Sequence, residues 1–102
     1  MELSIVIPVY NSSSIISELC AQLVDALSEI DFEIMLVDDR SEDASWLTIK
    51  KLAEEIEPVQ GLCLARNFGQ DNAIMAGLNY SSGQHVIIMD DDLQHSPYDI
   101  PA

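Results

Sequence analysis

The stretch HVIIMDDD, residues 85–92, runs from an apolar segment directly into three carboxylates. An apolar run of this length, rich in β-branched residues, is typical of a strand buried on both faces of a parallel sheet. Three similar runs come earlier in the chain: LSIVIPV at 3–9, FEIMLV at 32–37 and VQGLCLA at 59–65. We therefore expect four buried strands, the last of which leads straight into the acidic run.

Helical patterns separate these strands. Apolar residues at helical spacing predict a first helix that ends near Ile30. A second helix is predicted over residues 45–56, and Pro58 prevents it from continuing. A third helix is predicted over residues 71–80. Gly83 lies just beyond the third helix, and we expect it near the C-cap.

Strand, helix and strand alternate three times, which favours a parallel sheet joined by helical crossovers. We expect one α/β domain over residues 1–102, with a four-stranded, mostly parallel sheet and three helices. The sequence stops where a further element should begin, so we also expect a truncated chain.

The charge balance restricts the partners. The chain has 4 Lys plus Arg against 18 Asp plus Glu, for a net charge of −14. Binding to nucleic acid needs clustered basic residues, and an anionic lipid surface would repel this chain, so neither is expected as a partner. An anionic ligand would need a divalent cation between itself and the protein.

The cysteines and the apolar runs bear on the compartment. Cys20 and Cys63 lack metal-ligand spacing, and we expect both to be buried thiols in a reducing compartment. The start of the chain has no basic signal-peptide region, and no apolar run approaches the roughly 20 residues of a membrane-spanning helix. These features predict a soluble, cytoplasmic location.

Polar residues follow every predicted strand, at the edge where open α/β sheets bind ligands. They are Tyr10 and Asn11, Asp38 and Asp39, Arg66 and Asn67, and Asp90, Asp91 and Asp92. The opposite ends of the strands carry Glu2, Glu33 and Gln84, which we expect to be ordinary surface residues. This asymmetry predicts a site at the carboxyl edge of the sheet.

The three adjacent aspartates repel one another, and a hard divalent cation would relieve that repulsion. Alternation along an extended chain places Asp90 and Asp92 on one side and Asp91 on the other. With a carbonyl oxygen such as that of Gln94, they would offer oxygen ligands to Mg²⁺ or Mn²⁺. The alternative is an acidic turn that caps a following helix.

The other polar residues of this edge also have two interpretations. Asp38 and Asp39 would hydrogen-bond a nucleoside base or a ribose hydroxyl, or else cap the helix that follows. Tyr10 would stack on a base, or simply pack at the end of its strand. Arg66 would contact a phosphate or carboxylate, or form a structural salt bridge.

Several common nucleotide and hydrolase motifs are absent from the sequence. It contains no GxGxxG, no GxxxxGK[ST] and no GxSxG. A nicotinamide-binding domain, a P-loop enzyme and an α/β-hydrolase are therefore disfavoured.

Four segments together resemble family 2 glycosyltransferases: SIVIPVYN at 4–11, EIMLVDDRSED at 33–43, RNFGQ at 66–70 and MDDDLQH at 89–95. The last two look most like the subgroup that transfers sugars to polyprenyl phosphates, such as dolichyl-phosphate mannosyltransferase. The resemblance implies a Rossmann-like GT-A fold that binds a nucleotide sugar. One departure is Arg40, which stands where many members have glycine.

The resemblance also implies roles for single residues. Pro8, Tyr10 and Asp39 would line the nucleoside pocket, with Asp38 beside them. Arg66, Asn67 and Gly69 would border the same pocket.

The acidic run would be the DxD motif of the family. Asp90 and Asp92 would hold Mg²⁺ or Mn²⁺ against the diphosphate, with Gln94 as a third ligand. Asp91 would lie beside the sugar diphosphate through its backbone.

The implied activity is inverting transfer of a sugar from a UDP- or GDP-type donor to an acceptor, with a polyprenyl phosphate as the expected acceptor. The catalytic base of the family would lie beyond residue 102, so we expect this part alone to bind nucleotide weakly and to transfer no sugar. A full-length protein would be anchored at the cytoplasmic face of a membrane, and homo-oligomerisation is left open.

An alternative from another class is a non-catalytic α/β domain that binds a nucleotide or a divalent cation. A receiver-like signalling domain is disfavoured, because it needs a lysine at a late strand end and the chain has none after Lys51.

Overall fold

Four parallel strands form a single sheet in the computed structural model, which describes residues 2–11, 13–65 and 69–89. The strands are β1 (Leu3–Val9), β2 (Phe32–Asp38), β3 (Val59–Cys63) and β4 (His85–Ile88). The helices are α1 (Ser13–Ala26), α2 (Ser45–Glu55) and α3 (Gln70–Tyr80). The predicted α/β architecture is confirmed, and all the strand pairs in the described part are parallel.

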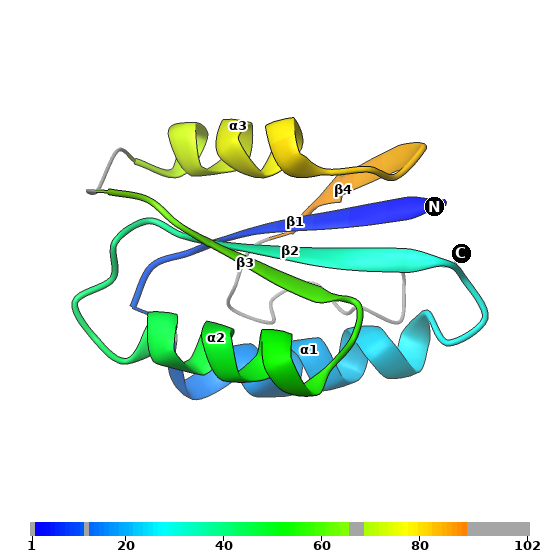
Figure 1. Cartoon of the computed structure of the whole chain (residues 1–102), viewed down its shortest axis with the longest axis horizontal. Coiled ribbons are helices and arrows are strands. Elements are labelled where there is room, and N and C mark those ends of the chain that lie inside the picture. Colours follow the sequence, from blue (N-terminus) through cyan, green and yellow to red (C-terminus); the bar gives the residue numbers. More distant parts are fainter. Residues whose placement is uncertain (1, 12, 66–68, 90–102) are drawn as a thin grey trace.

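The sheet lies between two helical layers. Helices α1 and α2 cover one face, and α3 covers the other (Figure 1). Every residue of β1 is buried, which explains why its sequence is continuously apolar and does not alternate. The larger core fills the α1–α2 side, and a smaller cluster of Val6, Met35, Val37 and Ala73 lies under α3.

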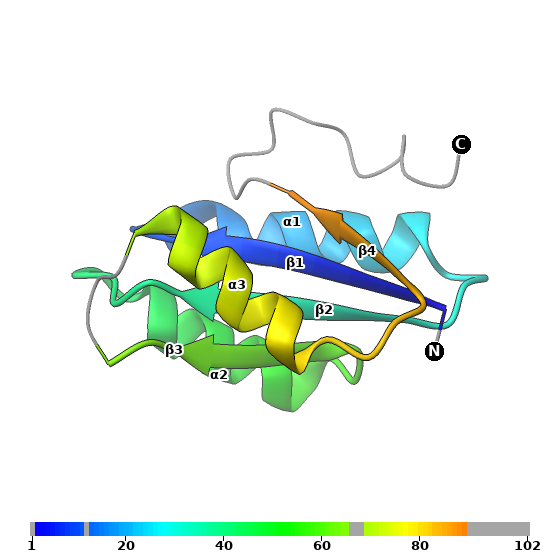
Figure 2. The same cartoon turned by 90° about the horizontal axis from the view of Figure 1, so that it is seen from above.

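The strand order is β3-β2-β1-β4. The chain moves outward from β1 to β2 and β3, and α3 then carries it back across the sheet to β4, on the other side of β1 (Figure 2). The order therefore reverses between β1 and β4, and ligands of open α/β sheets bind at the carboxyl ends of strands at such a point.

Pro8 occupies a central strand, where a residue without an N–H is unusual. Strand β1 pairs with β2 along its whole length, but its pairing with β4 ends at Val6 and Ile88. Pro8 lies beyond that last pair with β4, so the missing N–H leaves no gap on the β4 side of the strand.

Two sequence-based expectations about element ends were wrong. Helix α1 ends at Ala26, and a turn closed by the hydrogen bond from Ile30 N to Leu27 O replaces the last predicted helical turn. Helix α3 has no glycine cap, because Ser81 follows it directly in an extended conformation (φ −76°, ψ 148°). Gly83 has a different role, described below.

The two cysteines differ in environment, and both are free. Cys20 is buried in α1, where burial raises the pKa of its thiol to about 12. Cys63 ends β3 half-buried, with its thiol 3.7 Å from an Asp38 carboxylate oxygen. The expectation of two buried thiols is therefore met fully only at Cys20.

We expect a thiol reagent at pH 8 to modify Cys63 in the folded protein and to leave Cys20 unmodified, since the thiolate is the reacting form. The number of labels per chain, counted by mass spectrometry over time, checks this. In a denaturing concentration of urea both thiols should react alike. Equal rates in the folded state would contradict the burial of Cys20.

Candidate functional site at the carboxyl edge of the sheet

Backbone hydrogen bonds continue past the strand ends and hold the connecting loops together. Asp39 N donates to Val9 O at 2.9 Å, and Leu64 N donates to Asp38 O at 3.0 Å. On the other side of β1, Met89 N donates to Val6 O at 3.0 Å. The residues that follow β1 and β2 are therefore neighbours at the edge where the sequence predicts a site.

Asp38 is the last residue of β2 and is only 1% exposed. Its carboxylate accepts hydrogen bonds from the hydroxyl of Ser41 and from Ser41 N, the latter at 3.2 Å. These contacts close a tight turn, in which Arg40 takes a left-handed conformation (φ 57°). This is the position where many members of the resembled family have glycine, the residue that adopts such a φ most readily. A ligand contact of Asp38 stays a prediction.

Asp39 joins the end of β2 to the loop before α3. Its side chain is 5% exposed, and its Oδ2 accepts a hydrogen bond from Gly69 N at 3.0 Å. Gly69 has a φ of 95°, a conformation that residues with a side chain rarely adopt. The structure thus brings together two of the predicted pocket residues, Asp39 and Gly69.

Tyr10 directly follows β1 and is 44% exposed. Asp39 lies beside it, because Asp39 N is bonded to the carbonyl of Val9. Pro8, two residues earlier, is buried within β1. An aromatic ring open to solvent next to a buried carboxylate suits the face and the polar edge of a nucleoside base.

Asn11 and Asp43 tie the turns after β1 and β2 together, and sequence reasoning gave them no such role. Asn11 Oδ1 accepts a hydrogen bond from Glu42 N at 2.9 Å, and Asn11 N donates to Ser41 Oγ at 2.9 Å. Asn11 itself adopts a left-handed φ of 53°, which asparagine tolerates better than most residues. An asparagine directly after a buried strand was the available signal.

Asp43 connects the starts of two helices. Its carboxylate accepts hydrogen bonds from Ser45 N at 2.9 Å and from Ser13 N at 3.3 Å. Burial on its own would raise the pKa of Asp43, but hydrogen bonds from Ser45 and Ser13 outweigh it and hold the pKa below its usual value. Asp43, not Asp38, therefore accepts the hydrogen bond from the first residue of α2.

The remaining predicted site residues lie outside the described part of the chain: Arg66, Asn67, Asp90, Asp91, Asp92 and Gln94. Residues 2–11, 13–65 and 69–89 contain no group of three His, Cys, Asp or Glu side chains arranged to hold a metal ion. Met89 is 6% exposed and is the residue directly before the acidic run. It leaves the sheet at the carboxyl edge, beside the reversal of strand order.

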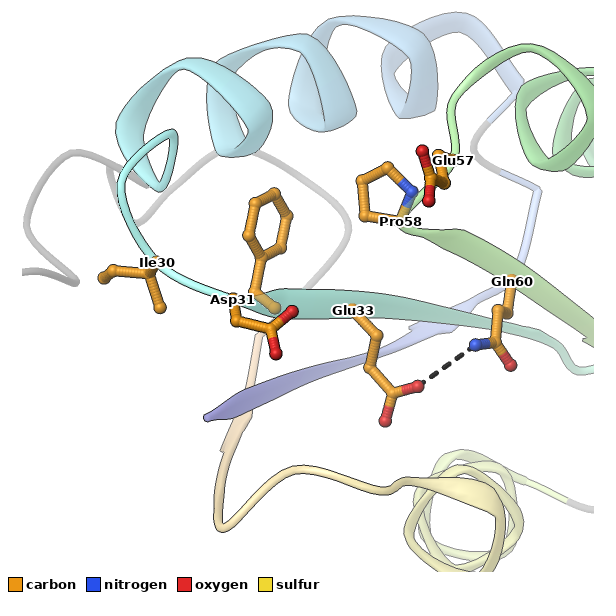
Figure 3. A pocket seen from close by; sticks show the side chains of 7 residues that line it. Ile30, Asp31, Glu33, Glu57, Pro58 and Gln60 are labelled. Atoms are coloured by element: carbon orange, nitrogen blue, oxygen red, sulfur yellow. Dashed lines mark hydrogen bonds between the residues drawn. The ribbon is translucent and has the colours of Figure 1, made fainter. Parts of the chain in front are cut away.

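A pocket of about 270 Å³ lies at the opposite edge, around the start of β2 (Figure 3). Its lining consists of Ile30, Asp31, Phe32, Glu33, Glu57, Pro58 and Gln60. It is distant from the predicted ligand edge. Glu33 was expected to be a surface residue, and that expectation was wrong, because the side chain is only 1% exposed.

The fold defines an α/β domain in which polar residues gather at the carboxyl edge of a parallel sheet, beside the point where the strand order reverses. Residues 4–102 match Glycosyl transferase family 2. The chain belongs to this family, as the four sequence segments suggested.

Curated relatives cover nearly the whole chain. Undecaprenyl-phosphate 4-deoxy-4-formamido-L-arabinose transferase of Pseudomonas fluorescens strain Pf-5 is 46% identical over 101 residues, which are 96% of this chain and 30% of the relative. The enzyme of the same name from Sodalis glossinidius is 42% identical over 98% of this chain and 32% of the relative. The chain thus spans about a third of the length of these relatives.

Solved glycosyltransferases share the fold. Staphylococcus aureus TarS (residues 1–349), in complex with UDP-GlcNAc, has a TM-score of 0.77 at 28% identity, over 90% of this chain and 27% of that one. Glucosyl-3-phosphoglycerate synthase from Mycobacterium tuberculosis, in complex with Mn²⁺, UDP and phosphoglyceric acid, has a TM-score of 0.77 at 18% identity. It covers 98% of this chain and 36% of that one, and at this identity it supports the GT-A fold alone.

The described part of the chain contains three helices, α1, α2 and α3. None of them is both long enough and apolar enough to cross a bilayer.

Proposed function

We propose that the chain is the donor-binding part of an inverting glycosyltransferase that takes its sugar from a nucleoside-diphosphate sugar. The observation that carries the proposal is the pair formed by Tyr10 and Asp39. Tyr10, which is exposed, and Asp39, which is buried, directly follow the two central strands, and the backbone bond from Asp39 N to Val9 O holds the two strand ends together. They meet next to the point where the strand order reverses.

In this proposal the nucleoside binds over β1 and β2. Tyr10 stacks on the base, and the carboxylate of Asp39 accepts hydrogen bonds from a base N–H or a ribose hydroxyl. Asp39 is well prepared for this role, because its hydrogen bond to Gly69 N fixes the carboxylate before the ligand arrives. Pro8 and Asp38 form the floor of the site.

The diphosphate binds next to β4. Arg66, Asn67 and Gly69 border it from the loop that leads to α3. Asp91 contributes backbone contacts, and TarS, at 28% identity, supports a sugar nucleotide as the ligand because its structure contains UDP-GlcNAc.

Asp90 and Asp92, with Gln94 as a third ligand, would hold Mg²⁺ or Mn²⁺. The ligand set fits these ions, since carboxylate and amide oxygens suit hard divalent cations. The need for a cation follows from charge, because a protein with a net charge of −14 offers few cationic groups to a diphosphate. When bound, the cation would stabilise the negative charge that develops on the leaving diphosphate.

We further propose a polyprenyl phosphate as the acceptor, in keeping with the names of the undecaprenyl-phosphate transferases that the chain resembles at 42–46% identity. A phosphate monoester has a second pKa of about 6. At neutral pH it is largely ionised and can attack with little help from a base. Such an acceptor places the longer protein at the cytoplasmic face of a membrane.

Calorimetric titration with UDP, GDP and their sugars, with and without Mn²⁺, tests the proposal. We expect one nucleotide series to bind more tightly when Mn²⁺ is present, and Asp92→Ala to remove the gain that Mn²⁺ provides. A nucleotide affinity that is the same with and without Mn²⁺ would instead indicate a non-catalytic nucleotide-binding domain. No binding to any nucleotide would refute the donor-binding role of this chain.

A further inference from the structure

A buried carboxylate lies near the amino ends of the strands, at the opposite end of the sheet from the predicted ligand site. Glu33, in β2, is 1% exposed. One of its oxygens accepts hydrogen bonds from the Ser4 hydroxyl and, at 2.6 Å, from Ser82 N. The other accepts from the side-chain amide of Gln60 at 3.1 Å (Figure 3). A buried carboxylate is costly unless it is hydrogen-bonded, and here both oxygens have donors.

The same cluster holds the segment that leads from α3 into β4. Gly83 N donates to the Ser4 hydroxyl at 2.7 Å, next to the bond from Ser82 N to Glu33. A Cβ atom at Gly83 would lie 2.5 Å from Ser4 N, so this segment passes directly over the backbone of β1. The two residues are thus fixed just before β4 begins at His85.

Strand β4 is held less extensively than the other strands, with Met89 in the core cluster and Ile87 packed against it. It is four residues long and lies at the edge of the sheet, where it pairs only with β1 among the described strands. Val86 and Ile88 are 39% and 48% exposed, so side-chain packing constrains them weakly. A slip by one residue would move the end of the strand by about 3.3 Å and reverse its faces, so the contacts that fix its register also fix where its end lies.

We propose that Glu33 is a positioning residue for the donor site at the far end of β4. By holding Ser82 N, it fixes the register in which Leu3 faces His85 and Val6 faces Ile88. That register sets where Met89 leaves the sheet, and therefore where the acidic run begins. The link to ligand binding rests on the proposed function, whereas the control of register does not.

The experiment compares four variants. Glu33→Leu removes the acceptor, and Glu33→Gln keeps an oxygen for Ser82 N. Ser82→Pro leaves Glu33 in place and removes the N–H donor, and Ser81 already has the extended conformation preferred before proline. Glu57→Leu is the matched control, since Glu57 lines the same pocket but is exposed.

The first readout is hydrogen exchange of the β4 amides. His85 N donates to Glu2 O, and Met89 N donates to Val6 O. In Glu33→Leu and Ser82→Pro we expect these two amides to exchange about tenfold faster. Asp39 N, which bonds β2 to β1, should be unchanged, as should every amide in the Glu57→Leu control and in Glu33→Gln. Unchanged β4 amides, or equal acceleration in all strands, would overturn the control of register by Glu33. If Glu33→Leu does not fold, Ser82→Pro decides alone.

The second readout is the dissociation constant for UDP or GDP, whichever the wild type binds, in the presence of Mn²⁺. We expect about a tenfold increase in Glu33→Leu and in Ser82→Pro, measured at a temperature where both are folded, with the affinity restored in Glu33→Gln. A purely structural role would lower the unfolding temperature and leave this constant unchanged. If the wild type binds no nucleotide, the donor-binding proposal fails while hydrogen exchange still decides the control of register.

Discussion

Replacing Gly83 by alanine should destabilise the chain by about 3 kcal/mol, the upper part of the usual range for inserting a methyl group into packed structure. The added Cβ would lie 2.5 Å from Ser4 N and 2.6 Å from the carbonyl carbon of Leu3. Both are backbone atoms of the central strand β1, which cannot move without breaking its pairing with β2 and β4. The clash therefore cannot be relieved by the movement of a flexible side chain.

Urea unfolding followed by circular dichroism measures this loss of unfolding free energy. In a thermal unfolding experiment, the melting temperature of a chain of this size should fall by roughly 15 °C. Ser82→Ala is the matched control, because it alters the neighbouring exposed side chain and keeps the N–H that bonds to Glu33. We expect that control to remain within about 0.5 kcal/mol of the wild type. A Gly83→Ala variant as stable as the control would show that the α3–β4 connection does not need its close approach to β1.

The strands, and the meeting of Asp39 with Gly69 at the carboxyl edge, could be predicted because their signals are local. An uninterrupted apolar run such as residues 3–9 indicates a strand covered on both faces, and the polar residue that follows marks where the strand leaves the core. Asp39 and Gly69 are 30 positions apart, yet both follow predicted strands, so parallel pairing was enough to place them at one edge. The two residues are indeed hydrogen-bonded there.

The cluster around Glu33 could not be predicted in the same way. A glutamate at the start of a strand ordinarily faces solvent, but this one is buried and bonds to Ser82, 49 positions later. Gly83 followed a predicted helix and so suggested a helix cap, although its real constraint is the backbone of Ser4, 79 positions away. Both errors come from contacts that depend on which strand lies next to which.

The end of the first helix shows a smaller error of the same origin. Leu27 is fully buried and continues the apolar spacing of α1, so the sequence pattern extends the helix beyond Ala26. The chain instead turns at residues 27–30 to begin β2 at Phe32. Periodicity reports which residues face the core, and a buried turn satisfies it as well as a helix does.

Asp39→Asn should weaken nucleotide binding about thirtyfold, whether or not Mn²⁺ is present. The amide oxygen of asparagine can still accept the hydrogen bond from Gly69 N, so the loop before α3 should keep its position. What is lost is a charged acceptor for the base or ribose, and hydrogen bonds to charged groups contribute about 2 kcal/mol, which corresponds to that factor. Calorimetric titration of the variant with UDP and GDP measures it.

The comparison with Asp92→Ala separates the two halves of the proposed site. Asp92→Ala should remove only the additional affinity that Mn²⁺ provides, whereas Asp39→Asn should lower the affinity by a similar factor in both conditions. Asp25→Asn, an exposed change in α1, controls for the loss of one negative charge and should leave both affinities unchanged. If Asp39→Asn affected binding only when Mn²⁺ is present, Asp39 would act through the metal site, and the nucleoside would have to bind elsewhere along the carboxyl edge.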